Sequence, residues 1–501
     1  FENNKGEVEK SRIQKIFQRY KLWISDLKKK SDSVVIASNF QISYYYPSSL
    51  ADSQNSDSIA FSINEINKKL TRFCSQIEDC FIFDYQKTIF SIGFKNLSDQ
   101  KLFFLGKIRQ SLQGQIILSS SLARQIAAVF YVPKKCLVLD ADNTLWGGIV
   151  GEEGINGIEL SDSYPGSVFK EFHKYLLRLR SNGILLAISS KNNEEDVFNV
   201  FKNHPDSILK KKHFSSHRIN WNDKAKNIIE ISKELNIGLD SIVFIDDNPI
   251  EREWVNKKLP EVLVPNLPSD PINYVECLEK LEAFDFLVSS KEDKKRATMY
   301  SQEINRNKEK QKSNSLDQFL KGLKMEARYE EINKSNIKRV AQLINKTNQF
   351  NLTLRRHRES DIKVLLNKNA ISVTLRLNDK YGDLGLIAVA IAGTDKTNGN
   401  VWEIDTFLLS CRALGRNIED LLLFILCEKI KSNIKKSKIL IEGKFNQGKK
   451  NNQVATFYPD RNFKRLKNFE NKWYRDIIND PFNKPAHIKV LDNEKRSRKK
   501  T

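Results

Sequence analysis

The stretch Cys136–Thr144, CLVLDADNT, decides the fold of the central part of the chain. Its four consecutive apolar residues are typical of a strand that is buried on both faces of a parallel sheet. Asp140 and Asp142 follow at once and are two residues apart, so both carboxylates can face the crevice at the carboxyl end of that strand. Open α/β sheets bind their ligands at this edge, which makes it the first place to look for a site.

Two later apolar runs also end in polar side chains. ILLAISS ends in Ser189 and Ser190, and SIVFIDD ends in Asp246 and Asp247. The second pair, together with Asp140, offers the oxygen ligands that Mg²⁺ prefers. Asp140 and Asp142 suit phosphoryl transfer, in which one carboxylate attacks phosphorus and the other moves a proton. A lone Asp-x-Asp is more often a turn or a helix cap, but three matching strand ends favour a site.

The chain of 501 residues is long enough for several domains. We predict an α/β protein with an N-terminal α/β block at 1–130 and a Rossmann-like parallel-sheet domain at 131–288. A charged linker at 289–315 is expected to lead into a mixed α/β domain at 316–490, followed by a basic tail at 491–501.

The three strand ends, in this order, resemble the haloacid dehalogenase-like superfamily of phosphotransferases. The resemblance implies that Asp140 is the nucleophile and that Asp142 is the general acid and base and offers its backbone carbonyl to the metal. It implies that Lys224, in the polar stretch NDKAKN, neutralises charge between nucleophile and phosphate; a lysine before a helix is otherwise a solvated surface residue. The implied metal site is Asp140, Asp142, Asp246 and Asp247, with Thr144, Asn192 and Ser190, or its neighbour Ser189, at the phosphate.

The sequence segments around these motifs resemble the FkbH-like family more closely. They are CLVLDADNTLWGGIVGEEG, ISSKNN, FIDDNPIERE, INKTNQFNLTLRR and DTFLLSCRALGR. In that family the phosphatase-like domain is followed by a domain similar to the Gcn5-related acyltransferases, and longer members begin with a domain similar to the SGNH hydrolases. Strand SVVIASNF ends in Ser38 and Asn39 without a GDS-like nucleophile motif, so the N-terminal block is expected to be inactive as an esterase.

The C-terminal domain carries a second group of candidate residues. RALGRN, Arg412–Asn417, lies between a strand and a helix, and its backbone N–H groups can hold a phosphate. It resembles the acyltransferase loop for coenzyme A, and the phosphate of a carrier's phosphopantetheine arm is the alternative occupant; an ordinary turn is the third possibility. The candidate phosphate-binding residues are Arg412, Gly415 and Arg416.

Two further side chains in this domain have a chemical and a packing interpretation. Cys411 adjoins the loop and is a candidate acyl relay, although cysteines beside apolar strands are mostly core residues. Tyr458 resembles the acyltransferases' general-acid tyrosine and equally fits core packing.

The charge balance is +21, from 83 basic and 62 acidic residues. Residues 131–280 hold 19 basic and 23 acidic residues, whereas 281–501 hold 46 and 27, a balance of +19. We therefore expect an acidic acyl carrier protein as partner of the basic part. Nucleic acid is the weaker alternative, because no nucleic-acid-binding motif occurs. No apolar run is long enough for a membrane span and no leader is evident, so we expect a cytoplasmic protein.

The resemblance implies that a three-carbon acyl donor, such as 1,3-bisphosphoglycerate, is dephosphorylated and its glyceryl unit loaded on the carrier thiol, as in polyketide biosynthesis. The alternative is a plain Mg²⁺-dependent phosphatase with an accessory acyltransferase-like domain, in surface polysaccharide or secondary-metabolite biosynthesis.

Overall fold

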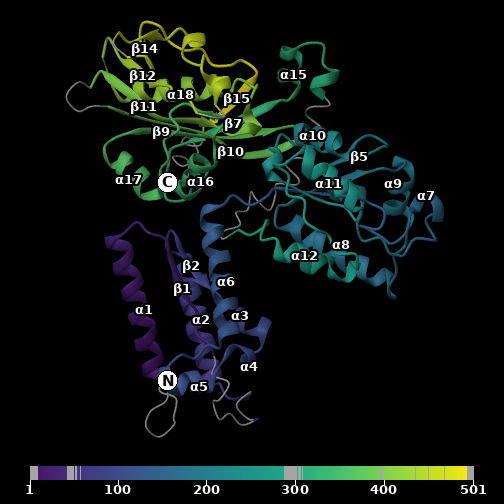
Figure 1. Ribbon diagram of the computed structural model, residues 1–501. Coiled ribbons are helices and arrows are strands. Elements are labelled where there is room, and N and C mark those ends of the chain that lie inside the picture. Colours follow the sequence, from purple (N-terminus) through teal and green to yellow (C-terminus); the bar gives the residue numbers. More distant parts are fainter. Residues whose placement is uncertain are drawn as a thin grey trace. The chain divides into compact units, whose positions relative to one another are not determined.

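The computed structural model describes residues 10–41, 50, 54–56, 58–286, 302, 306, 309–394, 399–434, 436–448, 451–467 and 469–492. The chain divides into two compact units (Figure 1). Unit 1 holds 1–211, 218–229 and 237–290, and unit 2 holds 212–217, 230–236 and 291–501. The predicted linker at 289–315 and the tail at 491–501 lie mostly outside the described residues, and the predicted domain boundaries stay predictions.

The N-terminal part of unit 1 is a helical block around a two-stranded parallel sheet. Strands β1 (Val35–Ser38) and β2 (Cys80–Phe83) pair in register Val35 to Cys80. The helices are α1 (Lys10–Lys30), α2 (Ile59–Ser75), α3 (Tyr85–Ile92), α4 (Phe94–Leu97), α5 (Gln100–Gly106) and α6 (Leu112–Phe130). Ser58 caps α2 by accepting a hydrogen bond from the Phe61 N–H, which satisfies a backbone donor at the helix start.

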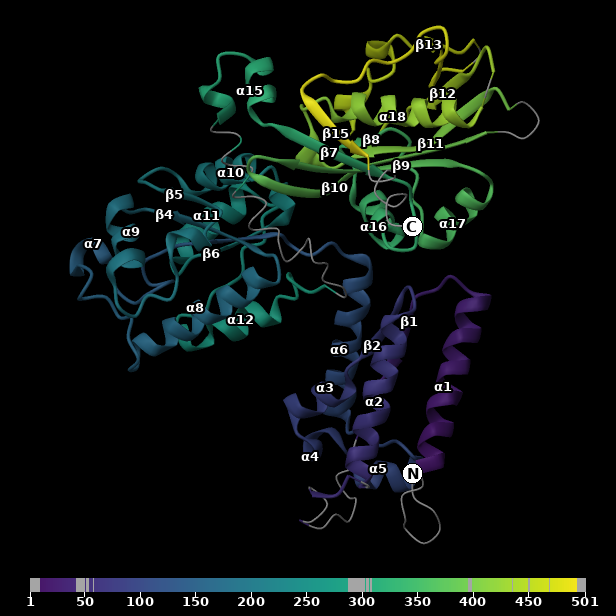
Figure 2. The ribbon, with the colours of Figure 1, turned by 180° about the vertical axis from the view of Figure 1, so that it is seen from behind.

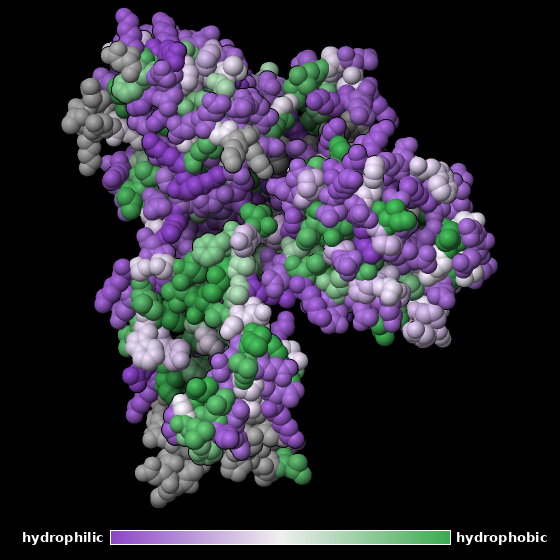
Figure 3. Space-filling model, viewed as in Figure 1, coloured by the Kyte–Doolittle hydropathy of each residue, from purple (hydrophilic) through white to green (hydrophobic). Residues whose placement is uncertain are grey.

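This block buries few apolar side chains and exposes many. Its buried cluster contains Ile24, Leu70, Cys74 and Cys80. Large apolar side chains stay exposed, and green patches cover much of this block in Figure 3. They include Phe104, Leu105, Leu112, Ile116 and Phe130. The block therefore gains little hydrophobic stabilisation for its size.

The rest of unit 1 is built on a sheet with strand order β5-β4-β3-β6. Strand β3 (Cys136–Leu139) pairs in parallel with β4 (Leu185–Ser190) on one side and β6 (Ile242–Ile245) on the other. All residues of these three strands are buried, as continuous apolar runs between two helical layers require. The fourth strand is β5 (Ser216–Ile219).

Helices follow the strands of this sheet. They are α7 (Val150–Glu153), α8 (Gly166–Ser181), α9 (Glu194–Asn203), α10 (Lys224–Glu234), α11 (Pro249–Lys258) and α12 (Tyr274–Lys280), with short turns η2 (Lys211–His213), η3 (Leu239–Ser241) and η4 (Pro271–Asn273). Because each crossover returns the chain to the same edge, the carboxyl ends of β3, β4 and β6 meet there.

Unit 2 contains a mixed sheet of nine strands in the order β13-β14-β12-β11-β10-β9-β7-β15, with β8 paired to β11. The strands are β7 (Met325–Glu330), β8 (Phe350–Asn351), β9 (Ile371–Asp379), β10 (Gly382–Thr394), β11 (Val401–Leu409), β12 (Leu440–Lys444), β13 (Lys464–Arg465), β14 (Lys472–Asp476) and β15 (Ile488–Asp492). Neighbours β9, β10 and β11 are antiparallel, whereas β11 and β12 are parallel.

Helices cover both faces of this sheet. Figures 1 and 2 show α18 (Ile418–Asn433) on one face and α16 (Ile337–Lys346) with α17 (Glu359–Asn367) on the other. Each face has its own buried cluster, one including Leu422 and Leu426 of α18 and the other Val340 and Ile344 of α16. The remaining elements are α15 (Leu316–Gly322), η5 (Cys411–Ala413), η6 (Asn452–Val454) and η7 (Pro459–Arg461).

The predicted fold class is confirmed: a parallel α/β region lies at the centre of the chain and a mixed α/β region follows it. None of the helices in the described ranges combines the length and the apolar character that crossing a bilayer requires.

Candidate active site

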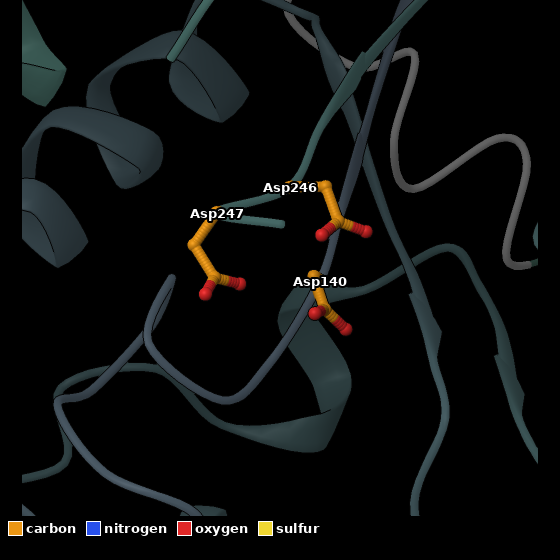
Figure 4. A group of neighbouring side chains, drawn as sticks. All are labelled: Asp140, Asp246 and Asp247. Atoms are coloured by element: carbon orange, nitrogen blue, oxygen red, sulfur yellow. The ribbon is translucent and has the colours of Figure 1, made fainter. Parts of the chain in front are cut away.

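Three carboxylates meet where β3 and β6 end. Asp140 follows β3, and Asp246 and Asp247 follow β6; one ligand oxygen of each lies within 4.8 Å of the other two. Figure 4 shows the three side chains grouped beside the strand ends. The Asp140 N–H donates to the Ile245 carbonyl at 3.0 Å, so the sheet ladder itself sets the two strand ends side by side.

Lys224 bridges two of these carboxylates from the start of α10. Its Nζ lies 2.5 Å from Oδ2 of Asp246 and 3.0 Å from Oδ2 of Asp140. The side chain is 3% exposed. Burial disfavours the ammonium form, but the charges of Asp140 and Asp246 outweigh burial and raise the pKa of Lys224.

The second carboxylate oxygen of Asp140 and the charge balance of the group indicate a cation site. Oδ1 of Asp140 is buried and has no hydrogen-bond partner among the described residues. Burial, followed by the negative charge of Asp140, raises the pKa of Asp246 to about 7 against the opposing effect of Lys224. The same two causes raise the pKa of Asp247. One lysine thus leaves the three carboxylates short of positive charge, and a divalent cation with oxygen preference fits this donor set.

Asp142 belongs to a different part of the site. Its Oδ1 accepts hydrogen bonds from Nε1 of Trp146 at 2.9 Å and from the Val150 N–H at 3.1 Å. Its Oδ2 accepts from Nδ2 of Asn192 at 2.7 Å. Burial raises the pKa of Asp142, which favours its protonated form. The Asp142 carboxylate lies outside the group formed by Asp140, Asp246 and Asp247, and the predicted role of the Asp142 backbone carbonyl as a metal ligand stays a prediction.

The other predicted residues of this site surround the same loop. Thr144 is buried within the turn that follows Asp140, and Ser189 and Ser190 are buried at the end of β4. Asn192 reaches the site through its bond to Asp142. Contacts thus link Lys224 with Asp140 and Asp246, and Asn192 with Asp142. Thr144, Ser189 and Ser190 are buried at the neighbouring turn and strand end, and their predicted roles stay predictions.

Three supporting side chains were not singled out from the sequence. Nη1 of Arg252 donates to the carbonyls of Asp246 and Asp247 at 2.6 and 2.7 Å, which holds the strand end in place. Trp146 binds Asp142, and the Tyr274 hydroxyl donates to the Asn143 carbonyl at 3.0 Å. The segment FIDDNPIERE contains Arg252, but its spacing does not show that the guanidinium reaches the carbonyls of Asp246 and Asp247. That contact depends on how the chain turns after β6.

A cavity of about 410 Å³ opens beside the carboxylates. Asn143 and Asp247 contribute to its wall from the site, and Gly147, Tyr164 and Tyr274 contribute from the surrounding loops. Gly148 has a φ of +89°, and a Cβ there would lie 2.5 Å from a carboxylate oxygen of Glu153. Glycine at position 148 therefore allows the loop to turn tightly at the mouth of the cavity.

The C-terminal candidates are placed differently. Arg416 is 4% exposed and its Nη1 lies 3.7 Å from Oδ2 of the buried Asp379. Gly415 and Asn417 both adopt left-handed backbone, with φ of +69° and +58°. Arg412 donates through Nε to Oγ of Ser410 at 3.2 Å. The turn is tightly built, and its occupancy by a phosphate stays a prediction.

Tyr458 is fully buried and stacks on Trp473 with ring centroids 5.4 Å apart. Burial raises the pKa of its hydroxyl, and the hydroxyl oxygen has no hydrogen-bond partner among the described residues. The predicted role of Tyr458 as a general acid stays a prediction. The side chain of Cys411 lies outside the described part of the structure, so its predicted role as acyl relay stays a prediction.

The fold and the site define a class of protein: a parallel α/β protein with a carboxylate cation site at its strand ends. Among solved structures, the chain is similar to the N-terminal part of the protein BF1531 from Bacteroides fragilis, which contains a phosphatase domain complexed with Mg. The two are 32% identical, the match covers 56% of this chain and 75% of that chain, and the TM-score is 0.51. The chain belongs to the family of this Bacteroides protein.

Other similarities are weaker. An acetyltransferase of the GNAT family from Staphylococcus aureus is 14% identical, covering 30% of this chain and 99% of that one at a TM-score of 0.23. Ard1 from Thermoplasma volcanium is 10% identical, with coverages of 30% and 97% and a TM-score of 0.23. No protein-family model matches the chain, and the search of curated proteins found no match.

Proposed function

We propose that this chain is a Mg²⁺-dependent phosphatase of the FkbH-like, haloacid dehalogenase-like type that acts on a phosphorylated three-carbon acyl donor and transfers the acyl unit to the thiol of an acyl carrier protein. One observation carries the phosphatase part: the buried Oδ1 of Asp140, which has no partner in the described part of the chain, lies beside Asp246, Asp247 and Lys224. The similarity to a phosphatase domain complexed with Mg supports it.

The residues present can carry out the two half-reactions. Bound Mg²⁺ would reduce the repulsion between an anionic nucleophile and an anionic phosphate, and Asp140, Asp246 and Asp247 would hold it. Asp140 attacks the phosphorus of the donor's ester phosphate through a carboxylate oxygen, and the bond from that phosphorus to the ester oxygen breaks, so the acyl phosphate at the other end of the donor stays intact for the transfer. Asp142 gives its proton to that leaving oxygen and then removes a proton from the water that hydrolyses the aspartyl-phosphate. Lys224 holds Asp140 in position throughout.

The supporting contacts explain how this geometry is kept. Trp146 and Asn192 fix Asp142 from two sides, so its carboxyl does not rotate into the group of metal-ligand candidates. Arg252 holds the backbone of Asp246 and Asp247. Such preorganised positioning is what phosphoryl transfer mainly requires of a protein.

The acyl-transfer part of the proposal rests on the resemblance of the sequence motifs to the FkbH-like family and on the positive charge balance of 281–501. An acyl phosphate is a mixed anhydride with an electrophilic carbon, so the protein need only hold a thiol against it. The excess of positive charge in 281–501 suits an acidic carrier protein. Coenzyme A is the alternative source of the thiol.

Exchange of the nucleophile tests the phosphatase part. Asp140→Asn keeps the size of the side chain but removes the attacking carboxylate, and we expect phosphate release with Mg²⁺ to fall by at least about 10⁴-fold. Asp162→Asn is the matched control, because its side chain is 89% exposed and binds Lys170. An Asp140→Asn protein that folds and still releases phosphate would remove Asp140 from its role.

The intact mass of the carrier tests the transfer part. The protein is incubated with Mg²⁺, 1,3-bisphosphoglycerate and phosphopantetheinylated carrier proteins, and each carrier is then weighed. A glyceryl adduct that needs the protein is the expected result. Phosphate release without an adduct on any carrier would overturn the transfer and leave the plain phosphatase.

A further inference from the structure

A histidine and an aspartate of unit 2 form a pair that neither the phosphatase site nor the RALGRN loop uses. Nε2 of His357 lies 2.6 Å from Oδ1 of Asp405, and both side chains are largely buried, at 13% and 12% exposure. Oδ2 of the same carboxylate binds Nη1 of Arg355, and the Thr406 hydroxyl donates to Oδ1 at 2.9 Å. Asp405 is therefore held from three sides.

The backbone places Asp405 by means of a β-bulge. Along the pairing of β10 with β11, Ile391 opposes Thr406 and Ala392 opposes Ile404, so Asp405 is the extra residue. A bulge turns one side chain out of the regular alternation and is often found next to active sites. The parallel pairing of β11 with β12 ends at Glu403, two residues before Asp405.

The loop that carries His357 is braced along its length. The Asn351 side chain accepts from the Leu354 N–H at 2.9 Å, and Leu354 has a φ of +54°, a left-handed conformation that a leucine adopts only under constraint. Arg356 donates to the Thr347 carbonyl at 3.0 Å, and Asn345 donates to the carbonyl of His357 itself at 3.0 Å. The imidazole is thus fixed from its backbone as well as from Asp405.

The charge of Asp405 determines which ring nitrogen of His357 can accept a proton. Burial would raise the pKa of Asp405, but hydrogen bonds from His357, Arg355 and Thr406 lower it to about 2, so Asp405 is a carboxylate at neutral pH. A carboxylate only accepts, and Nε2 of a neutral His357 must therefore carry the proton. Nδ1 then holds the lone pair, and the structure gives it no hydrogen-bond partner among the described residues. An imidazole oriented by a carboxylate is the usual form of a general base.

We infer that His357 is the general base of the acyl transfer and that Asp405 is its positioning residue, the acceptor being a thiol on a phosphate-bearing arm. The inference rests on the proposed transfer function. Nδ1 of His357 takes the thiol proton, sulfur bonds to the acyl carbon, and the bond from that carbon to phosphate breaks, with the electron pair leaving on phosphate. The proton passes to solvent, so the products are thioester and phosphate.

The surroundings of the pair suit such an arm. Arg355, Arg356 and Arg358 all lie on the exposed part of the loop around His357. Arginine side chains bind phosphate through paired N–H groups. Charged groups linked to the imidazole include Asp405 from β11, which it contacts, Arg355 from its own loop, which binds Asp405, and Glu403, which binds Arg355 at 3.3 Å.

His357→Gln tests the inference, because a glutamine amide can still donate to Asp405 but cannot accept a thiol proton at neutral pH. Acyl transfer from 1,3-bisphosphoglycerate to phosphopantetheinylated carrier is followed by mass, together with phosphate release in the absence of carrier and the midpoint of thermal unfolding. We expect transfer to fall by about 10²–10⁴-fold, with phosphate release and the midpoint unchanged. His204→Gln, a buried histidine of unit 1 that accepts from the Asp206 N–H, is the control.

The pH profile separates a base from a structural contact. The wild-type transfer rate should fall at acidic pH as one group is protonated, and the residual rate of His357→Gln should lack that limb. Asp405→Asn should lower the rate at saturating carrier and shift the limb. If the wild type transfers and His357→Gln transfers equally fast, or keeps the acid limb, the inference is overturned while the transfer function stands. If the wild type acylates no carrier, both are overturned.

Discussion

Asp140 shows how much of this site depends on a single oxygen atom. One oxygen of its carboxylate bonds to Lys224, and the other is buried with no partner among the described residues. A buried polar atom without a partner costs roughly 1–3 kcal/mol, and more when it is charged. The carboxylate therefore gains stability from any cation that binds it.

Magnesium should for this reason stabilise the folded protein. A ligand of the native state alone adds about 2.7 kcal/mol at a hundredfold excess over its dissociation constant. We expect MgCl₂ to raise the unfolding temperature of unit 1 and EDTA to reverse the change. In Asp246→Asn the increase should be smaller, since the amide has no negative charge and keeps only one of the two carboxylate oxygens. An equal increase in both proteins would show that the ion binds elsewhere.

Helix α8 illustrates the element scale, because one of its residues contacts the turn that follows Asp140 and Asp142. His173 is fully buried, and its Nε2 donates to the carbonyl of Leu145, in the turn after Asp140 and Asp142, at 2.8 Å. Burial lowers the pKa of His173 to about 4. The folded protein thus keeps this histidine neutral in the range where a free histidine becomes charged.

The sign of the resulting pH dependence follows from the direction of this shift. Between the ordinary histidine value of 6.5 and about 4, the unfolded chain binds a proton that the folded chain does not. Stability is therefore lost as the pH falls through this range, by about 2 kcal/mol at pH 5. His173→Gln should lose less between pH 7.5 and pH 5 in urea unfolding. Equal losses would mean that His173 titrates normally.

At the scale of the whole molecule, charge is unevenly distributed. The region 131–280 has a balance of −4, and 281–501 has a balance of +19. If an acidic carrier protein binds the basic region, its association rate should fall by roughly tenfold between 50 and 300 mM NaCl. Phosphate release from a small substrate should change much less, and it serves as the control. An association rate of the carrier that does not change with NaCl concentration would contradict this expectation.

Stability should also vary along the chain. The N-terminal block has a small buried cluster and many exposed apolar side chains, whereas β3, β4 and β6 are buried throughout. Amide hydrogen exchange by mass spectrometry should therefore be faster in peptides from α2 than in peptides from β3. Equal protection in the two regions would show that they unfold together.

Much of the site could be predicted from local sequence. The apolar runs that end at Asp140, Ser190 and Asp246 identify themselves as strands, and parallel strands joined by helices bring their carboxyl ends to one edge. The roles of Asp142 and Lys224 needed the family resemblance as well. The spacing of residues in the sequence did not predict that Asp142 accepts hydrogen bonds from Trp146 and Asn192. It did not predict that Lys224 donates to Asp246 either.

The sequence alone determined which residues stand at the strand ends and in what order, because strand periodicity is a local property of the chain. Only the tertiary structure decided which side chains meet. His357 and Asp405 are 48 residues apart, and their contact depends on a bulge in β11 and on a braced loop. Arg416 and Tyr458 are buried in the fold, and their predicted roles in ligand binding and catalysis stay predictions. Contacts between distant segments depend on register and packing, which no short stretch of sequence encodes.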